Sequence, residues 1–382
     1  MSAKQVCSRC VMDSDTPEIS FAADGVCNYC RQFDRLCLDN PIGAEGRRRL
    51  DAIVKRQKKD GEGRKYDVLI GMSGGTDSTY LLHTAMEYGL RPLCVHLSNG
   101  WDTSISTENM DRILKRHSID ALNIEIDPSG TTELIKCFMR AGLPWIDGPT
   151  DIAMVSTLYR QAKAHGIKYI WVGNNFRSEG RQPDEWTHID SRLIAAVHHR
   201  FGGASMRSFP NMTPWNMFDW WILHGIKMIR PLNFLNYNKT EVKKFLAGEY
   251  GWQDYGGHHH ENLFTKFALV VWLYRKFGID KRKVTFSACV RTGEMSRSDA
   301  IEMLKTPPCD DTEAESLCRM VRERFEFSEA EFDALMNVEK KSFHDYPSYF
   351  SFYRRFHGII NVLFRMGVGF RPMMTYDVRQ GK

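Results

Sequence analysis

The strongest constraint on this chain is a six-residue turn with the sequence SGGTDS, formed by Ser73, Gly74, Gly75, Thr76, Asp77 and Ser78. A short apolar run at 68–72 precedes the turn, and apolar residues recur at helical spacing from Thr76 to Tyr88. This pattern predicts a strand, a glycine turn and a helix. Glycine lets the backbone approach a ligand closely, and the first turn of a helix presents unpaired N–H groups and the positive end of its dipole. We therefore expect an anion to bind in this turn.

The polar side chains of the turn indicate which anion it binds. The hydroxyls of Ser73, Thr76 and Ser78 add hydrogen-bond donors. Asp77 is a carboxylate beside an expected polyphosphate, which predicts a Mg²⁺ ion between them and a catalytic role for Asp77. The common phosphate loop, G-x-x-x-x-G-K-[ST], does not occur in the sequence. The alternative is an ordinary glycine turn in an α/β domain, which predicts no ligand.

With its flanking strand and helix, the turn resembles the S-G-G-x-D-S signature of the ATP pyrophosphatases known as the PP-loop family. The resemblance implies that the six residues bind the pyrophosphate of ATP. It also implies that the enzyme adenylates a carbonyl-type oxygen. ATP and Mg²⁺ are the expected cofactors.

Length and charge limit the remaining possibilities. A chain of 382 residues is long enough for two or three domains with a sizeable core. The net charge of +5 and the pI near 8.6 suit an anionic substrate, but they fall short of the clustered basic charge typical of nucleic-acid binding. The apolar run from Phe267 to Tyr274 is far shorter than the roughly 20 residues that span a bilayer. Because no signal-peptide pattern opens the sequence, we expect a cytoplasmic location without nucleic-acid or membrane partners.

Four of the ten cysteines form two C-x-x-C pairs, Cys7 with Cys10 and Cys27 with Cys30. Their spacing suits a tetrahedral Zn²⁺ site, because each pair can place two thiolates on one side of the metal. Turn residues between the pairs are consistent with a small loop-rich fold that a metal stabilises. Two disulfides are the alternative, but the other six cysteines are scattered and no secretory signal is apparent. Residues 1–40 are therefore predicted to form a zinc ribbon.

The middle of the chain alternates predicted strands and helices, which indicates an α/β fold with a doubly wound parallel sheet. We expect strands at 92–98, 122–126 and 168–172, and helices near 104–117 and 151–165. Ligands of such sheets bind beyond the carboxyl ends of the strands. Polar or aromatic residues follow the strands or begin a helix there: His96, Trp101, Asp102, Thr150, Asp151, Gly173, Asn174, Asn175 and Glu179. Ordinary loop chemistry could account for any one of them.

Taken together, these segments resemble the N-acetyl sugar amidotransferases of bacterial surface-polysaccharide (LPS O-antigen) biosynthesis. The segments 25–30, 99–102, 149–151, 173–175 and 251–257 carry the resemblance, which covers nearly the full length. His258 departs from the family pattern, which has lysine there. The resemblance implies that His96, Gly173 and Asn174 join the SGGTDS turn in binding the nucleotide. It implies substrate-binding roles for Trp101, Asp102, Thr150, Asp151, Asn175, Glu179, His259 and Glu261.

The second half of the chain is predicted to be largely helical. We expect a connecting helix at 41–65, the PP-loop domain at 66–257, and a helical domain at 258–382 that covers the active site. Lys266 is a candidate catalytic donor to phosphate, with a solvent-exposed lysine as the alternative. The run His258-His259-His260-Glu261 lacks the i, i+4 spacing of helical metal ligands and suits phosphate or sugar contacts instead. The aromatic segment 214–221 predicts a packed seam between domains, with a platform for a sugar ring or the adenine as the alternative.

These features together predict an ATP-dependent amidotransferase, a carbon–nitrogen ligase that converts the N-acetyl group of an anionic nucleotide-linked sugar to an acetamidine. A UDP-linked N-acetyl uronic acid is the expected substrate. The family resemblance implies that a separate glutaminase with a cyclase-like subunit supplies ammonia. The alternative is a PP-loop tRNA thiolase, which needs a sulfur carrier such as a reactive cysteine, with Cys94, Cys137 and Cys289 as candidates. A non-catalytic zinc-ribbon binding module is a third hypothesis, and it leaves the SGGTDS turn unexplained.

Overall fold

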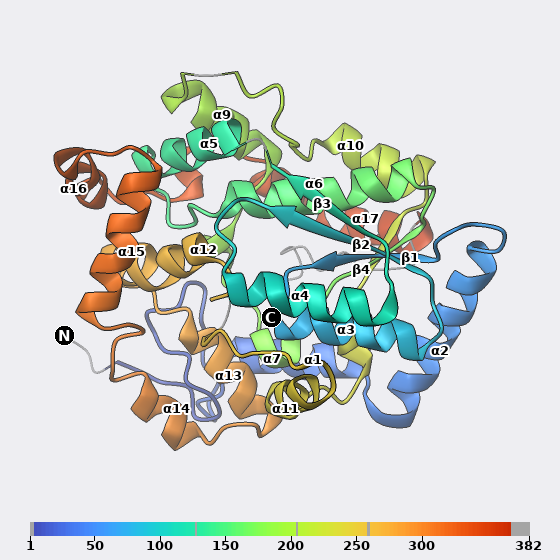
Figure 1. The fold of residues 1–382 in the computed structure, drawn as a ribbon. Helices are drawn as coiled ribbons and strands as arrows, with labels where there is room; N and C mark the ends of the chain where they lie inside the picture. Colours follow the sequence, from blue (N-terminus) through green and yellow to red (C-terminus); the bar gives the residue numbers. More distant parts are fainter. Residues whose placement is uncertain (1–3, 127, 204, 258–259, 368–382) are drawn as a thin grey trace.

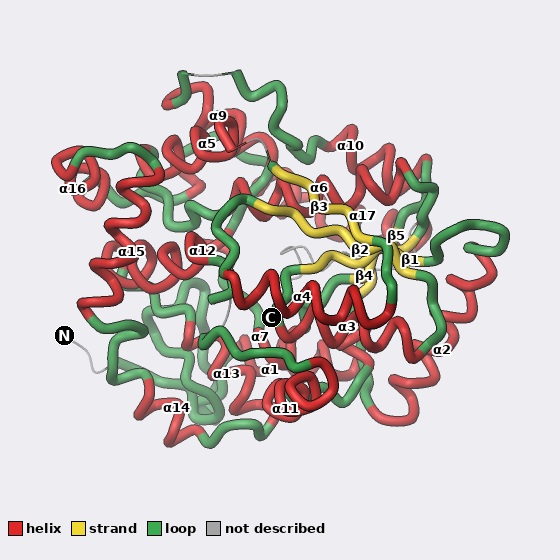
Figure 2. The backbone as a smooth tube through the Cα atoms, viewed as in Figure 1, coloured by secondary structure: helices red, strands yellow, loops and turns green. Residues whose placement is uncertain are grey.

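A five-stranded parallel sheet forms the centre of the molecule in this computed structural model, which describes residues 4–126, 128–203, 205–257 and 260–367 (Figures 1 and 2). The strand order is β3-β2-β1-β4-β5, and each neighbouring pair is parallel. The strands are β1 (Val68–Met72), β2 (Pro92–Ser98), β3 (Ala121–Glu125), β4 (Tyr169–Trp171) and β5 (Lys227–Ile229). The predicted parallel α/β sheet is thereby confirmed, and β5 is a strand that the sequence analysis missed.

Helices cover both faces of the sheet because successive strand residues point in opposite directions. Leu69 of β1 packs in one hydrophobic cluster, whereas Val68 and Ile70 pack in another. On the face of Val68 and Ile70 lie α3 (Thr76–Glu87) and α4 (Ser104–His117), and on the opposite face lies α6 (Gly148–Ala164) (Figure 1). Strand β1 is thus buried on both sides, and its carboxyl end leads directly into the SGGTDS turn.

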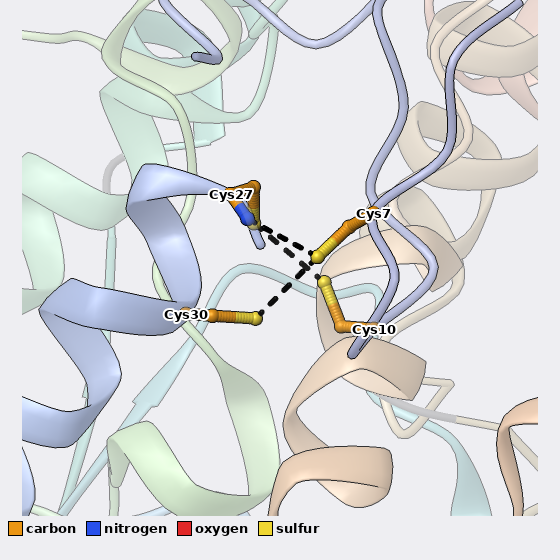
Figure 3. A group of neighbouring side chains, drawn as sticks. All are labelled: Cys7, Cys10, Cys27 and Cys30. Atoms are coloured by element: carbon orange, nitrogen blue, oxygen red, sulfur yellow. Dashed lines mark hydrogen bonds between the residues drawn. The ribbon is translucent and has the colours of Figure 1, made fainter. Parts of the chain in front are cut away.

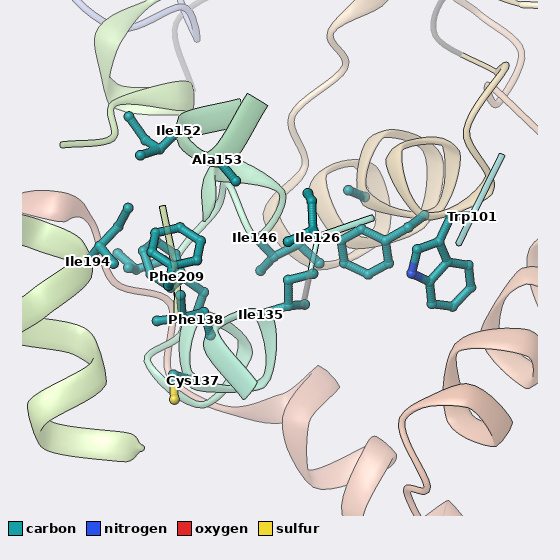
Figure 4. Close-up of a cluster of buried hydrophobic side chains, with 14 of the residues drawn as sticks. Trp101, Ile126, Ile135, Cys137, Phe138, Ile146, Ile152, Ala153, Ile194 and Phe209 are labelled. Carbon is teal, nitrogen blue, oxygen red and sulfur yellow. The ribbon is translucent and has the colours of Figure 1, made fainter. Parts of the chain in front are cut away.

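The larger hydrophobic cluster extends from α6 to the helices around it (Figure 4). Ile152 and Ala153 of α6 face Ile194 and Phe138, which belong to two neighbouring helices. The helices of this part are α5 (Pro128–Arg140), α7 (Phe176–Glu179), α8 (Asp184–Thr187), α9 (Ser191–Phe201), α10 (Pro214–Phe218) and α11 (Lys239–Tyr250). The aromatic segment divides between core and surface: Trp220 stacks on Tyr159 with ring centroids 5.1 Å apart, whereas Trp215 is 68% exposed.

The N-terminal segment contains two helices, α1 (Asn28–Asp39) and α2 (Gly43–Asp60). Helix α2 confirms the predicted connecting helix. Helix α1 was not predicted; it begins directly after Cys27, so the second cysteine pair lies at a helix N-terminus.

The C-terminal part is helical, as predicted. Its helices are α12 (Leu263–Phe267), which continues as a π-helical segment (Ala268–Phe277), and α13 (Arg282–Thr292), α14 (Arg297–Met303), α15 (Asp311–Arg324), α16 (Glu329–Asn337) and α17 (Phe350–Gly367). The predicted capping box of α16 is present, because Ser328 and Glu331 each accept the other's backbone N–H. Among the described residues, none of the helices combines the length and the apolar character that crossing a bilayer requires.

Candidate active site

The SGGTDS turn is a tight loop between β1 and α3 that requires glycine. Gly74 has φ +70°, and a Cβ atom there would lie 1.8 Å from the carbonyl oxygen of Ser106. The loop is closed by the Ser73 N–H, which donates to Ser78 Oγ at 3.2 Å, and by Thr79 Oγ1, which donates to the Gly75 carbonyl at 2.8 Å. The first turn of α3 therefore begins beside Gly75, as an anion site at a helix N-terminus requires.

Residues far along the chain border this turn. The indole N–H of Trp252 donates to the Gly74 carbonyl at 3.0 Å. A Cβ atom on Gly75 would lie 3.1 Å from the Tyr255 hydroxyl and 3.3 Å from Glu261 Oε1. Burial and the charge of Glu261 raise the pKa of Tyr255, so its hydroxyl stays protonated and able to donate. Glu261, which was predicted to bind substrate, thus lies directly against the SGGTDS turn (residues 73–78), which we call the phosphate turn from here on.

Asp77 is engaged by two residues that the sequence analysis did not identify. Lys239 Nζ donates to Asp77 Oδ2 at 2.8 Å, and the Tyr237 hydroxyl donates to Oδ1. Burial opposes the charge of Lys239, but the nearby Asp77 carboxylate outweighs it and raises the lysine pKa. Neither residue belongs to a recognisable motif; the weak signal is that Asn238 between them caps α11. In this structure a lysine neutralises the carboxylate that was predicted to hold Mg²⁺.

The end of β4 meets the start of α3 at Gly173. A Cβ atom on Gly173 would lie 3.0 Å from Asp77 Cβ, so a larger residue would displace the phosphate turn. Asn174 Nδ2 donates to Glu179 Oε2 at 3.3 Å. Asn175 is 1% exposed and caps α7 by accepting the Ser178 N–H at 2.9 Å. Four predicted residues, Gly173, Asn174, Asn175 and Glu179, therefore lie beyond the carboxyl end of β4. The side-chain oxygen of Asn175 has a structural role there, because it caps α7.

His96 lies at the carboxyl end of β2, paired in register with Met72 at the end of β1. Its Nδ1 lies 2.9 Å from the Met72 carbonyl oxygen and its Nε2 lies 3.3 Å from Asp102 Oδ2. Burial alone would lower the pKa of His96, but the hydrogen bonds to Asp102 and to the Met72 carbonyl raise it. The histidine and the carboxylate therefore form a polar pair within reach of the phosphate turn.

A cavity of about 380 Å³ opens beside this pair, between α4 and strands β2 and β3. Its lining combines apolar side chains, among them Met72, Met110 and Leu114, with the polar groups of His96 and Asp102. Its volume falls within the range of pockets for small molecules. The cavity thus places His96, a predicted nucleotide-binding residue, beside apolar side chains against which an aromatic ring could pack.

Two other predicted site residues have protein partners. Trp101 is 4% exposed and packs in the hydrophobic core against Phe264, with ring centroids 5.5 Å apart (Figure 4). Lys266 forms an ion pair with Glu313 of α15. His259 lies outside the described residues.

Thr150 and Asp151 lie in the first turn of α6, next to a buried acidic residue that the sequence analysis overlooked. Asp151 Oδ2 accepts the indole N–H of Trp145 at 2.7 Å, and Asp147 Oδ2 accepts the Thr265 hydroxyl at 2.6 Å. Burial and the neighbouring Asp151 raise the pKa of Asp147 to about 7. Its sequence signal was its position two residues before the P-T-D element at 149–151.

The four paired cysteines converge on one point (Figure 3). All four are buried, and their sulfur atoms lie within 4.8 Å of one another. Two measured Sγ···Sγ distances, Cys7 to Cys30 and Cys10 to Cys27, are both 3.8 Å. Four thiolates about 2.3 Å from one tetrahedral ion would be about 3.8 Å apart, so this geometry fits a single metal ion. The residues present therefore suit a closed metal site, in which these four cysteines would be the ligands.

The cysteine cluster is tied to the helical part by arginine. Arg291 of α13 donates from Nε to Cys30 Sγ at 3.2 Å and from a terminal nitrogen to Cys10 Sγ at 3.3 Å. Arg297 donates to the backbone carbonyls of Cys7 and Cys10. A guanidinium beside two thiolates offsets part of the negative charge that four cysteines bring to a divalent ion.

The structure contains the features expected of the PP-loop family: a parallel sheet, the SGGTDS turn between β1 and α3, an N-terminal four-cysteine cluster and a helical C-terminal part. Residues 261–358 match the family model described as "LPS biosynthesis protein WbpG-like, C-terminal domain". This match confirms the predicted resemblance to a surface-polysaccharide biosynthesis family.

Similarity to individual proteins is more distant. The chain is 25% identical over 309 residues to an uncharacterized protein of Methanocaldococcus jannaschii, covering 79% of this chain and 93% of that protein. The NH3-dependent NAD synthetase of Campylobacter jejuni has 11% identity and a TM-score of 0.32, over 73% of this chain and 93% of that chain. The U34-tRNA thiolase NcsA of Methanococcus maripaludis has 12% identity and a TM-score of 0.29, over 76% of this chain and 90% of that chain.

Proposed function

We propose that this protein is an ATP-dependent amidotransferase that forms AMP and pyrophosphate while converting the N-acetyl group of an anionic nucleotide-linked sugar to an acetamidine. The contact between Glu261 and the phosphate turn carries the proposal. Glu261 is the first residue of the segment that matches WbpG-like proteins, and its carboxylate borders Gly75 of the ATP-binding signature. The polysaccharide-related domain and the nucleotide turn therefore share one site.

The proposed chemistry begins with activation of the acetamido oxygen, which is a poor leaving group. The N–H groups of the first turn of α3 would hold the phosphates of ATP, and the cavity beside His96 would receive the adenine. The acetamido oxygen would attack the α-phosphate, releasing pyrophosphate and leaving an adenylated imidate. Asp77 would hold Mg²⁺, which supplies charge neutralisation for the phosphates when bound. Lys239, next to Asp77, is placed to share that task.

In the second half of the reaction, ammonia attacks the activated carbon and AMP leaves. We propose that a separate glutaminase with a cyclase-like subunit supplies the ammonia, as the family resemblance implies, and that the reaction takes place in the cytoplasm. The cysteine cluster would hold a structural zinc ion, because four thiolates leave no open position for chemistry. An iron–sulfur cluster is the competing occupant. Elemental analysis distinguishes zinc from iron.

The candidate sulfur carriers of a tRNA thiolase have an unfavourable environment. Burial raises the pKa of Cys94 to about 12 and that of Cys289 to about 11, and burial with the Glu133 charge raises that of Cys137 to about 11. A nucleophilic or persulfide-forming thiol needs a lowered pKa. This observation supports nitrogen transfer over sulfur transfer through these cysteines.

The test is a product assay with the purified chain. The chain is incubated with ATP, Mg²⁺, ammonium chloride and a panel of UDP-linked N-acetyl sugars and N-acetyl uronic acids. AMP and pyrophosphate released only in the presence of one acceptor, together with an acceptor one mass unit lighter (oxygen replaced by NH), would support the proposal. Release of ADP and phosphate, or AMP release that depends on tRNA instead of a sugar nucleotide, would contradict it.

A further inference from the structure

A partly buried polar cluster surrounds Lys281, a residue to which the sequence analysis gave no role. Lys281 Nζ lies 4.1 Å from the centroid of the Trp145 ring. The indole N–H of the same tryptophan binds Asp151 at 2.7 Å. Lys281 precedes α13 within the WbpG-like segment, whereas Trp145 and Asp151 flank the start of α6. The cluster therefore joins the polysaccharide-related segment to the sheet domain.

The charges around Lys281 are mainly negative. The carboxylates of Asp147, Asp151 and Glu179 all act on the lysine, and Glu179 also interacts with the cation Arg230. Burial nevertheless dominates and lowers the pKa of Lys281 to about 8. Three carboxylates thus act on two cations in a partly buried space, where an additional anion would be repelled and a cation or a neutral amine would be accepted.

Asp147 provides an independent sign of a ligand. Its side chain is 3% exposed, and Oδ2 accepts the Thr265 hydroxyl. Its other oxygen, Oδ1, is buried and has no hydrogen bond of standard geometry within the part of the chain that the structure describes, although the nearby Thr150 hydroxyl also acts on this carboxylate. Leaving a buried carboxylate oxygen without a good hydrogen bond costs free energy, so we expect a small hydrogen-bond donor to bind at Oδ1.

Two hydrogen-bonded connections link this cluster to the phosphate turn. On one side, Thr265 joins Asp147 to Asn262, whose neighbour Glu261 faces Gly75. On the other side, Glu179 accepts a hydrogen bond from Asn174, which follows Gly173 at the contact with Asp77. A molecule in the cluster would therefore lie next to the place where the acetamido group is adenylated.

We propose that Lys281, with Asp147, forms the site that receives ammonia and accepts the proton it loses during attack. This inference rests on the proposed function. An aromatic face and carboxylates bind ammonium, whereas a cluster of this sign does not suit a phosphate or a uronate carboxylate. Lys281 shares this cluster with Asp147, so its amine is placed to exchange a proton with a nucleophile held at Asp147 Oδ1.

In the attack step, the ammonia nitrogen forms a bond to the carbon of the protonated O-adenylated imidate, which gives a tetrahedral adduct with a positively charged nitrogen. The unprotonated Lys281 amine removes one proton from that nitrogen, and the C–O bond breaks with its electron pair on oxygen. AMP leaves, the product is the amidinium, and Lys281 becomes an ammonium. Asp147 orients the nucleophile through Oδ1.

Lys281→Arg tests this role, because arginine keeps the charge but does not deprotonate near pH 8. Lys283→Arg is the matched control: Lys283 lies two residues further on, in α13, and forms its ion pair with Asp13. Two rates are measured with the acceptor from the UDP-sugar panel. Acceptor-dependent exchange of labelled pyrophosphate into ATP without ammonium reports adenylation, and amidine formation with ammonium chloride, expressed per unprotonated ammonia, reports attack.

We expect Lys281→Arg to keep exchange within about threefold of wild type and to lose at least about 10²-fold in amidine formation, the usual contribution of a general base. The wild-type rate should rise through about pH 8, and the variant should lack this step. Asp147→Asn should also spare exchange and slow amidine formation. The inference is overturned if Lys281→Arg forms amidine at the wild-type rate, or loses exchange and amidine formation equally while folded. Absence of exchange by the wild-type chain would overturn the proposed function itself.

Discussion

Lys239 Nζ lies 2.8 Å from Asp77 Oδ2, so the carboxylate of the phosphate turn is neutralised by a lysine 162 residues further along the chain. The side chain of Lys239 is 22% exposed and that of Asp77 is 16% exposed, which makes this pair stronger than an exposed ion pair. In the proposed reaction, the pair would separate or share its charges with ATP and Mg²⁺. The net charge at the phosphate turn is therefore set by two segments of the chain: the turn itself and the residues at the start of α11.

Asp77→Asn is expected to lower acceptor-dependent AMP formation by at least about 10²-fold, or roughly 2.7 kcal/mol of transition-state stabilisation. Asparagine keeps the shape of the side chain but loses the charge that would hold Mg²⁺, whereas the N–H groups of the turn still meet the phosphates. ATP binding, measured by calorimetry, should be affected less than turnover. Near-normal AMP formation by the variant would contradict the role given to Asp77.

Lys239→Met is expected to weaken ATP binding by about 10-fold or more, because it removes a cation that contacts the SGGTDS turn and leaves Asp77 without its ion-pair partner. Lys243→Met is the matched control. Lys243 lies on the same helix, but it pairs with Asp254 on the surface. If both variants bind ATP equally, Lys239 has no part in the nucleotide site.

Arg291→Ala is expected to reduce metal affinity by 10- to 100-fold, because it removes two N–H···S hydrogen bonds from the cysteine cluster. The direct comparison is Cys27→Ser, which should lower metal content and melting temperature before it affects activity. Arg9→Ala, which removes an exposed pair with Asp34, serves as the control. Metal content by elemental analysis is the measurement. A Cys27→Ser variant that lost activity with unchanged metal content and melting temperature would refute a structural role.

Asp184→Asn is expected to stabilise the protein above neutral pH. Burial raises the pKa of Asp184 to about 7, so the folded state favours the protonated form. This contribution to stability is complete below the unfolded pKa near 4 and is lost as pH rises through about 7, a change of at most about 4 kcal/mol. The variant should melt higher than wild type at pH 8 and similarly at pH 4. The exposed-site variant Asp333→Asn should change neither value, and an unchanged pH dependence in Asp184→Asn would contradict the prediction.

Replacing Cys94, Cys137 and Cys289 together by alanine is expected to leave acceptor-dependent AMP formation within about threefold of wild type. All three thiols have raised pKa values, and the small volume change should cost stability more than activity. Circular dichroism establishes that the variant is folded. Loss of turnover in the folded variant would favour sulfur transfer.

The sequence alone was sufficient for features that depend on neighbouring residues. The apolar run at 68–72, the glycines and the helical periodicity after Thr76 predicted β1, the turn and α3, because strand and helix periods are local properties. The spacing of the two cysteine pairs predicted one metal site for a similar reason, since each pair brings two sulfurs together within four residues. The capping box at Ser328 and Glu331 is equally local.

Tertiary structure alone decided which side chains meet at the site. Tyr237 and Lys239 reach Asp77 because β5 pairs beside β4 and α11 then returns towards α3, an arrangement for which no periodic pattern exists. Lys281, just before α13, contacts Trp145, just before α6, although 136 positions separate them in the sequence, and burial gives the lysine its lowered pKa. Burial and charge pairing depend on residues far apart in the chain, so the chemistry of these lysines could be recognised only after the chain had folded.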